Sequence, residues 1–273
     1  LGEQRESFMA DYKFNLQPAT DEQPYFFHFF KWRVVPELMA LKGQGGLPLL
    51  EMGYPILIAT LIQAMLASFI LILLPLTILG RYQERSVPVS RRTRVLVYFS
   101  MLGLAFLFIE MAFIQRFTLF LHHPLYSISV VLASFLLFAG MGSAYSNRIE
   151  RDDKRALAIR WAVAGILILS LGYLLVLENL FSSMAGIAIA LKALTSIALI
   201  APLGFCMGIP FPLGLAKLNN LAPELIPWAW GINGCASVIS AVLATLLAIH
   251  LGFSIVVLLA LVFYVGAAVS VPR

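Results

Sequence analysis

The sequence is short of charged residues. Only 12% of its 273 residues are Asp, Glu, Lys or Arg, whereas 60% are hydrophobic. Soluble globular domains are about 25% charged and about 45–50% apolar. A water-soluble fold of this length could not cover so much apolar surface, but a lipid bilayer removes that need. The composition therefore excludes an ordinary soluble domain and indicates an integral membrane protein.

Cysteines and the motifs of common catalytic sites are also scarce. The two cysteines, Cys206 and Cys235, both lie inside apolar stretches, so the sequence holds neither a disulfide framework nor a metal-ligand spacing. It contains no Walker A motif, no Gly-rich dinucleotide loop and no nucleophile elbow. We therefore expect no catalytic residue, no metal site and no cofactor site in this chain.

Long apolar runs are the main feature of the sequence. Runs of about 18 or more apolar residues predict transmembrane helices. We find seven, at roughly 54–79, 95–119, 124–146, 157–177, 184–209, 228–250 and 253–271. The predicted fold is an all-α integral membrane protein with about seven transmembrane helices, and the lipid bilayer is its expected partner.

Residues 1–53 differ from the rest of the chain. They are polar, and they include a turn-rich stretch at 18–24, an aromatic run at 25–32 and a Gly-rich stretch at 42–46. Pro and Asp favour turns, and Gly-rich stretches are typical of linkers. The chain also begins with Leu1 and not Met. We interpret residues 1–53 as the end of a soluble domain plus a linker, and expect the sequence to be a fragment of a longer protein.

The basic residues indicate an orientation in the membrane. The formal net charge is +5, and Lys and Arg gather in the predicted loops 80–94, 147–156 and 210–227, whereas 120–123, 178–183 and 251–252 contain none. Short basic loops face the cytoplasm. The pattern therefore predicts a multi-pass protein of the bacterial inner membrane with these three loops inside, and it does not indicate nucleic-acid binding. Residues 1–53 would then lie outside if 54–79 spans the membrane.

Two isolated charges lie within predicted transmembrane helices. Glu110 is about nine residues from the outer end of its apolar run, and Lys192 is about eight residues from the outer end of its own, which correspond to about 14 Å and about 12 Å. Intramembrane charges are rare and mark functional sites by default. We predict that Glu110 and Lys192 are partners. The pair would serve either to fix helix packing or to form a substrate or proton site.

Three further polar residues complete the candidate site. Gln115 and Arg116 follow Glu110 on the same run, and Arg116 is close enough to the outer end to reach the interface with its long side chain. Asn233, among small residues of the run at 228–250, could hydrogen-bond across helices. Small residues that would allow close helix packing are Gly140, Gly142, Ser143, Gly204, Gly208, Gly231, Gly234, Ala236 and Ser237.

Several motifs, in order, resemble the membrane region of the large bacterial spermidine/spermine synthase-like proteins. They are the stretches Phe108–Arg116, His123–Tyr126, Gly140–Ser143, Met207–Gly214 and Trp228–Gly234, and Pro18–Pro24 resembles the segment that leaves the synthase-like domain of those proteins. The resemblance implies an upstream domain related to aminopropyltransferases, a nucleoside cofactor of the S-adenosylmethionine type in that domain, and a polyamine-like ligand. The Gly-rich cofactor loop and acidic catalytic residues of that domain are not in this chain, so no catalytic residue is carried over.

The last six predicted helices also resemble half of a major-facilitator transporter, although the Gly-x-x-x-Asp-Arg-x-Gly core of that family's loop motif is not intact. Three hypotheses follow. The chain is the membrane portion of a synthase-like fusion protein, which anchors the soluble domain and binds or moves a small polar or cationic substrate. Alternatively, it is half of a secondary transporter, or a membrane scaffold without a ligand.

Overall fold

The structure is a computed structural model that describes residues 12, 20, 22, 23, 31, 53–79 and 88–272. Among these residues, all regular secondary structure is helical, apart from one isolated β-bridge between Thr20 and Gln23. The elements are α3 (Gly53–Ser68), the π-helical segment η4 (Phe69–Leu73), α4 (Leu74–Leu79), α5 (Val89–Leu121), α6 (Pro124–Ser146), α7 (Asp152–Ser183), α8 (Ile189–Met207), α9 (Pro210–Leu221), the 3-10 turn η7 (Pro223–Leu225), α10 (Ile226–Leu251) and α11 (Phe253–Val269). The prediction of an all-α fold is confirmed for the described part of the chain.

Six helical segments of this part are long and apolar enough to cross a bilayer. They are Gly53–Ile78, Val89–Leu121, Pro124–Ser146, Asp153–Ser183, Ile189–Leu221 and Pro223–Leu251. The seventh apolar helix, α11, has 17 residues. At 1.5 Å per residue it is about 25 Å long, slightly shorter than the about 30 Å of a bilayer core. The architecture is therefore that of a multi-pass membrane protein.

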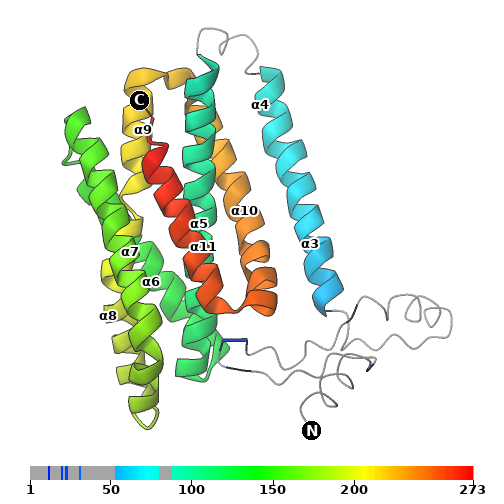
Figure 1. Ribbon diagram of the computed structural model, residues 1–273, viewed down its shortest axis with the longest axis vertical. Helices are drawn as coiled ribbons and strands as arrows, with labels where there is room; N and C mark the ends of the chain where they lie inside the picture. Colours follow the sequence, from blue (N-terminus) through cyan, green and yellow to red (C-terminus); the bar gives the residue numbers. More distant parts are fainter. Residues whose placement is uncertain are drawn as a thin grey trace, which may run out of the picture.

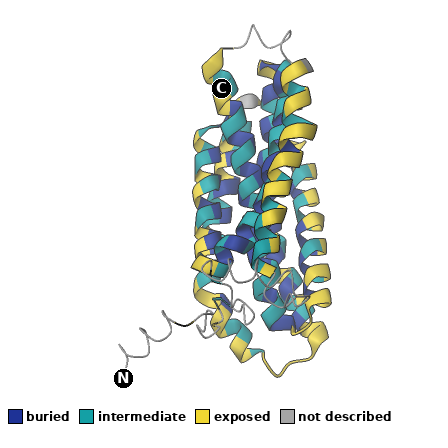
Figure 2. Ribbon diagram, turned by 90° about the vertical axis from the view of Figure 1, so that its right-hand side faces the viewer, coloured by how far each residue is buried: buried dark blue, intermediate teal, exposed yellow. Residues whose placement is uncertain are grey.

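The long helices run alternately up and down (Figure 1). We name the two ends of the bundle by their place in that view. The lower end comprises residues 20, 22 and 23 with 116–123, 184–192 and 250–254, and the upper end comprises residues 88–94, 147–155 and 217–226. Exposed residues lie on the outside of the bundle (Figure 2). Many of them are large and hydrophobic, and a bilayer would cover them.

Helix α5 forms the centre of the bundle, and the α3–α4 segment lies at its edge. In the most apolar window of α5 56% of residues are buried, against 6% in that of α3–α4. The edge segment packs along α10, where the Tyr54 hydroxyl lies 2.8 Å from Nε2 of His250 and the Cys235 thiol lies 3.7 Å from the Ser68 carbonyl oxygen. One face of α3–α4 thus contacts protein, and the rest is available to lipid.

The bounds of the three predicted basic loops are wrong. Helices α5 and α7 begin at Val89 and Asp152, so the ends of the predicted basic loops 80–94 and 147–156 are first helical turns. The predicted loop 210–227 contains α9. Charged residues continue a helix beyond its apolar part, and proline is tolerated in a first turn because no partner is needed there for its missing N–H. Residues 80–87 lie outside the described residues.

The predicted close packing of small residues is confirmed between α6 and α8. A Cβ atom on Gly142 would collide with the carbonyl of Phe205, and one on Gly208 would collide with the carbonyl of Ala139. Only glycine permits backbones to approach so closely. At Gly140 and Gly234, by contrast, a Cβ atom would meet nothing within 4 Å, so the packing role predicted for these two glycines is wrong.

Candidate functional sites at the middle and lower end of the bundle

The first candidate site is a cavity near the middle of α5. We name it the central cavity; its volume is about 220 Å³. It is lined from α5, α10, α11 and the junction of α8 and α9, by Leu102, Gly103, Phe106, Leu107, Met207, Phe211, Asn233, Ser237 and Tyr264. Its position halfway along a 33-residue helix places it deep in the predicted membrane.

Two polar groups give the central cavity a hydrogen-bonding character. The side chain of Tyr264 is 1% exposed, and its hydroxyl has no hydrogen-bond partner in the described part of the chain. Asn233 donates from Nδ2 to the carbonyl oxygen of Phe99 at 3.0 Å, so the predicted bond across helices is present. Buried hydroxyls in native proteins nearly always have a partner. The Tyr264 hydroxyl is therefore well suited to a guest molecule in the cavity.

Glu110 is not a lining residue of this cavity, but it lies on the same side of α5 as two residues that are. It follows Gly103 by seven residues and Leu107 by three, which places the three residues on one side of α5. Its side chain is 5% exposed, it interacts electrostatically with Tyr264, and it forms no ion pair with any described residue. A buried carboxylate without a counter-charge is costly, so this side of α5 favours a cationic or proton-donating neighbour.

The second candidate site is a pocket at the lower end, between the end of α5, the end of α7 and the start of α8. We name it the lower pocket; its volume is about 350 Å³. The residues that line it are Arg116, Leu119, Phe120, His122, Glu178, Asn179, Phe181, Ser182, Ala185 and Lys192. Two of the sequence-predicted residues, Arg116 and Lys192, therefore share one pocket.

Lys192 is buried beneath an aromatic pair in this pocket. Its side chain is 3% exposed, and Nζ donates to the carbonyl oxygen of Phe120 at 3.2 Å and lies 5.3 Å from the centroid of the Phe120 ring. That ring stacks on Phe181 with a centroid separation of 4.1 Å. The ammonium group thus has a carbonyl and a π-face as neighbours, and no described carboxylate lies within ion-pairing distance.

The predicted partnership of Glu110 and Lys192 is wrong. Lys192 contacts Phe120, which follows Glu110 by ten residues, or about 15 Å along one continuous helix. The error comes from the start of α8. The sequence placed it near residue 184, but α7 extends to Ser183 and α8 begins at Ile189, so Lys192 lies in the first turn and far from mid-membrane depth.

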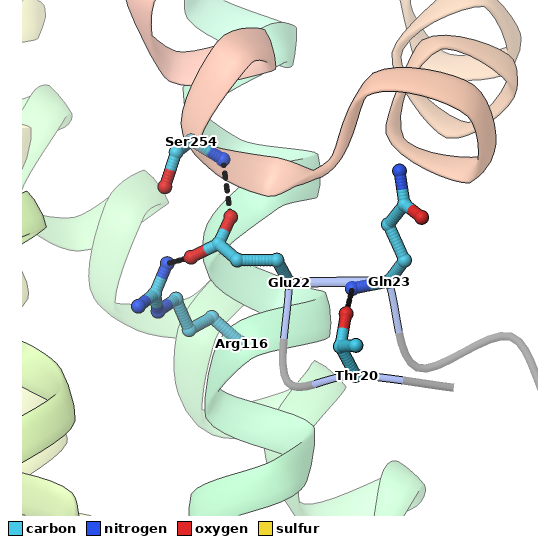
Figure 3. A network of polar contacts seen from close by, with 5 residues as sticks. All are labelled: Thr20, Glu22, Gln23, Arg116 and Ser254. Atoms are coloured by element: carbon cyan, nitrogen blue, oxygen red, sulfur yellow. Dashed lines mark hydrogen bonds and ion pairs between the residues drawn. The ribbon is translucent and has the colours of Figure 1, made fainter. Parts of the chain in front are cut away.

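A contact that the sequence did not predict joins the N-terminal segment to the lower end. Glu22 accepts a hydrogen bond from Nη1 of Arg116 at 2.7 Å through Oε1 and from the Ser254 N–H at 3.0 Å through Oε2 (Figure 3). Its carbonyl oxygen accepts the Phe253 N–H at 3.2 Å. Glu22 thereby satisfies two of the unpaired N–H groups at the start of α11.

Thr20 and Gln23 lie beside Glu22, and we name residues 20, 22 and 23 the docked turn. Gln23 donates from Nε2 to the carbonyl oxygen of His250 at 3.1 Å, at the end of α10, and its N–H donates to Thr20 within the turn. The residue before α11 is Gly252, which has no side chain to cap the helix and has φ of 86°. The capping group comes instead from a residue 232 positions away, which no local sequence pattern could reveal.

The electrostatics of Glu22 favour its charged form. Partial burial raises the pKa of this carboxyl, but the Ser254 N–H and the Arg116 guanidinium lower it by more, so the pKa lies below its usual value. Arg116, which we expected to reach the interface freely, is instead held with a side chain that is 12% exposed. Gln115 is half-buried and lines neither the central cavity nor the lower pocket.

Comparisons of this chain with protein-family models, with curated proteins and with solved structures found no match. The functional argument therefore rests on the geometry of the described residues. Among them, no group of three or more His, Cys, Asp or Glu is placed to hold a metal ion.

Proposed function

We propose that this chain is the membrane portion of a synthase-like protein, and that it anchors the preceding soluble domain at the lower end of the bundle. The observation that carries the proposal is the docking of Glu22 and Gln23 onto the lower end. The resemblance of the motifs to the membrane region of spermidine/spermine synthase-like proteins supplies the identity of the domain.

The docked turn is suited to anchoring because it contacts three helices at once. Glu22 reaches Arg116 of α5 and the first turn of α11, and Gln23 reaches the last turn of α10. Hydrogen bonds to charged groups are among the stronger ones in proteins, at about 1.5–3 kcal/mol each. A segment held in this way would restrict the position of whatever immediately precedes it.

The charge of the two ends supports an orientation for the anchor. The upper end contains eight basic residues, namely Arg91, Arg92, Arg94, Arg148, Arg151, Lys154, Arg155 and Lys217. The lower end contains two, Arg116 and Lys192. By the positive-inside rule the upper end faces the cytoplasm and the docked turn faces outward. A domain on that side would not meet cytoplasmic S-adenosyl compounds, so the proposal implies a use of the synthase-like fold other than conventional transfer.

Cysteine labelling tests the orientation. Glu150→Cys and Gly186→Cys, each in a chain without Cys206 and Cys235, place one thiol at each end of the bundle. A membrane-impermeant maleimide applied to intact spheroplasts is expected to label position 186 and to label position 150 only after lysis. Labelling of position 150 in intact spheroplasts would contradict the proposed orientation.

Limited proteolysis tests the anchor. Residues Arg5, Lys13, Lys31 and Arg33 are sites for trypsin on either side of the docked turn. We expect Glu22→Ala to speed cleavage in this region several-fold relative to the wild type, because the turn loses its two charge-assisted contacts. Asp153→Ala, which removes a carboxylate at the upper end, is the matched control. Equal cleavage rates for all three proteins would refute the anchor.

A second function is favoured by the central cavity, namely binding or transfer of a small cationic molecule. The motivating observations are the buried Glu110, which interacts electrostatically with Tyr264, and the Tyr264 hydroxyl, which has no hydrogen-bond partner among the described residues. We propose 1,4-diaminobutane as a probe because its ammonium groups match the carboxylate and its chain matches the apolar lining. It should raise the Tm of the wild type and of Glu150→Gln but not that of Glu110→Gln. No shift in the wild type would leave the anchoring role as the function of the bundle.

A further inference from the structure

We propose that the lower pocket binds an anionic group of the phosphate class, held by Lys192 with support from Arg116. The group could belong to a lipid headgroup or to a soluble phosphate. This site is separate from the central cavity. It shares Arg116 with the docked turn, but its principal residue, Lys192, bonds to Phe120 and not to that turn.

The first argument is the charge balance of Lys192. Lys192 is 3% exposed and lines the lower pocket, yet no described carboxylate lies within 4.0 Å of its Nζ. The Phe120 carbonyl takes one of its three N–H donors. Buried charges in proteins are paired or coordinated, because desolvation of an isolated ion costs far more than a hydrogen bond returns. An anion in the pocket would supply the missing charge and accept the remaining donors.

The second argument is the position of Lys192 on α8. It is the fourth residue of a 19-residue helix whose first turn contains no acidic residue. The start of a helix carries a partial positive charge, which disfavours a cation and favours an anion. The start of α8 and the ammonium group of Lys192 are both positive, so together they raise the electrostatic potential in the pocket.

The third argument is the second cation on the same pocket wall. Arg116 lines the lower pocket and gives one hydrogen bond to Glu22. A guanidinium has five N–H donors in a planar fork, a geometry that matches phosphate oxygens. Glu22 neutralises Arg116, so the pair leaves Lys192 as the uncompensated charge. Arg116 can then contribute a donor to an anion without losing its contact with Glu22.

The remaining polar residues of the lower pocket affect how an anion would bind. Asn179, Ser182 and His122 add polar groups to the lining, and the volume of about 350 Å³ accommodates a phosphate group. Glu178 also lines the pocket, but it is exposed and forms no ion pair with a described residue. The negative charge of Glu178 would repel an anion and so lower the affinity of the pocket for it. Glu178 also does not pair with Lys192, so it does not take the place of the proposed anion.

The test measures thermal unfolding of the purified full chain in two arms. In detergent, inorganic phosphate is titrated against chloride of equal ionic strength. In nanodiscs, phosphatidylcholine alone is compared with a mixture containing phosphatidylglycerol. We expect at least one anion to raise the Tm of the wild type and of the control Lys217→Met. The apparent affinity of Lys192→Met should be about tenfold weaker or worse, the effect of losing one charge-assisted hydrogen bond.

The two arms separate the sources of the anion. A response to inorganic phosphate in detergent assigns the site to a soluble anion, and a response confined to phosphatidylglycerol assigns it to a lipid headgroup; both support the site. The proposal is overturned if neither anion raises the Tm of the wild type, or if Lys192→Met responds as the wild type does. Should Lys192→Met fail to fold, Glu178→Gln decides: tighter binding supports the site and weaker binding contradicts it.

Discussion

The two ends of the bundle use charge in different ways. At the upper end, Arg151 and Asp153 form an ion pair whose side chains are 71% and 65% exposed. At the lower end, Arg116 and Glu22 are 12% and 43% exposed, and Lys192 is buried. Exposed ion pairs contribute little to stability, because water and salt screen them. The comparison teaches that an exposed ion pair such as Arg151–Asp153 adds little to the packed structure, whereas the pair Arg116–Glu22 and the buried Lys192 are part of it.

The largest loss of stability is expected from a substitution at Gly252, which lies next to Glu22. Its φ of 86° and ψ of 164° lie in a region essentially restricted to glycine. We expect Gly252→Ala to destabilise the protein by about 1–3 kcal/mol. Thermal unfolding in detergent measures the change. Gly186→Ala, in the turn between α7 and α8, is the control, because a Cβ atom there meets nothing within 4 Å. Equal Tm values for the two variants would show that the backbone conformation at residue 252 does not require glycine.

A smaller effect is expected from the carboxylates of the two ion pairs. Glu22→Ala removes a helix-capping group, and such losses cost about 1 kcal/mol. Asp153→Ala should change the Tm much less, because its pair with Arg151 is local and mostly exposed. Both variants are compared with the wild type by thermal unfolding at low salt. If Asp153→Ala proved the more damaging substitution, the contrast between the two ends would be reversed.

The smallest effect is a pH dependence of the lower end. The pKa of Glu22 is lowered in the folded state, so the carboxylate stabilises the fold above its unfolded-state value of about 4.5. This contribution is lost as the pH falls through the lower, folded-state pKa. We therefore expect the Tm difference between the wild type and Glu22→Gln to be constant near neutral pH and to shrink below about pH 4.5. A difference that grew on acidification would show that the sign is wrong.

The fold was largely accessible from the sequence because the bilayer imposes a simple rule. A spanning helix must satisfy every backbone group internally and be apolar for about 20 residues, so long apolar runs such as 124–146 match helices of the structure. The ends of helices are less accessible. Charged residues such as Arg91 and Asp153 continue the hydrogen-bonded helix beyond the apolar run, and an apolar turn such as 185–188 looks like helix in composition.

The candidate sites were accessible only in part. The burial of Glu110 and Lys192 could be predicted, because each is a lone charge in an apolar run. The neighbours of these two residues could not be predicted. The start of α8 was predicted five residues too early, so the expected position of Lys192 was wrong by about 7–8 Å along the helix axis. Tyr264 was missed because a tyrosine in an apolar run gives no signal until its hydroxyl is seen to lack a partner. Glu22 was missed because its partners are remote in sequence.

The docked turn has a consequence for the order of biosynthesis. Ser254, to which Glu22 binds, is translated 232 residues after it. Contacts between residues so far apart in the chain form late, after local structure is in place. During translation Glu22 can meet Arg116 first, whereas its bond to Ser254 can form only after α10 and α11 have been made and the chain has turned at Gly252. The complete set of contacts of Glu22 therefore requires that the last two helices are already in place.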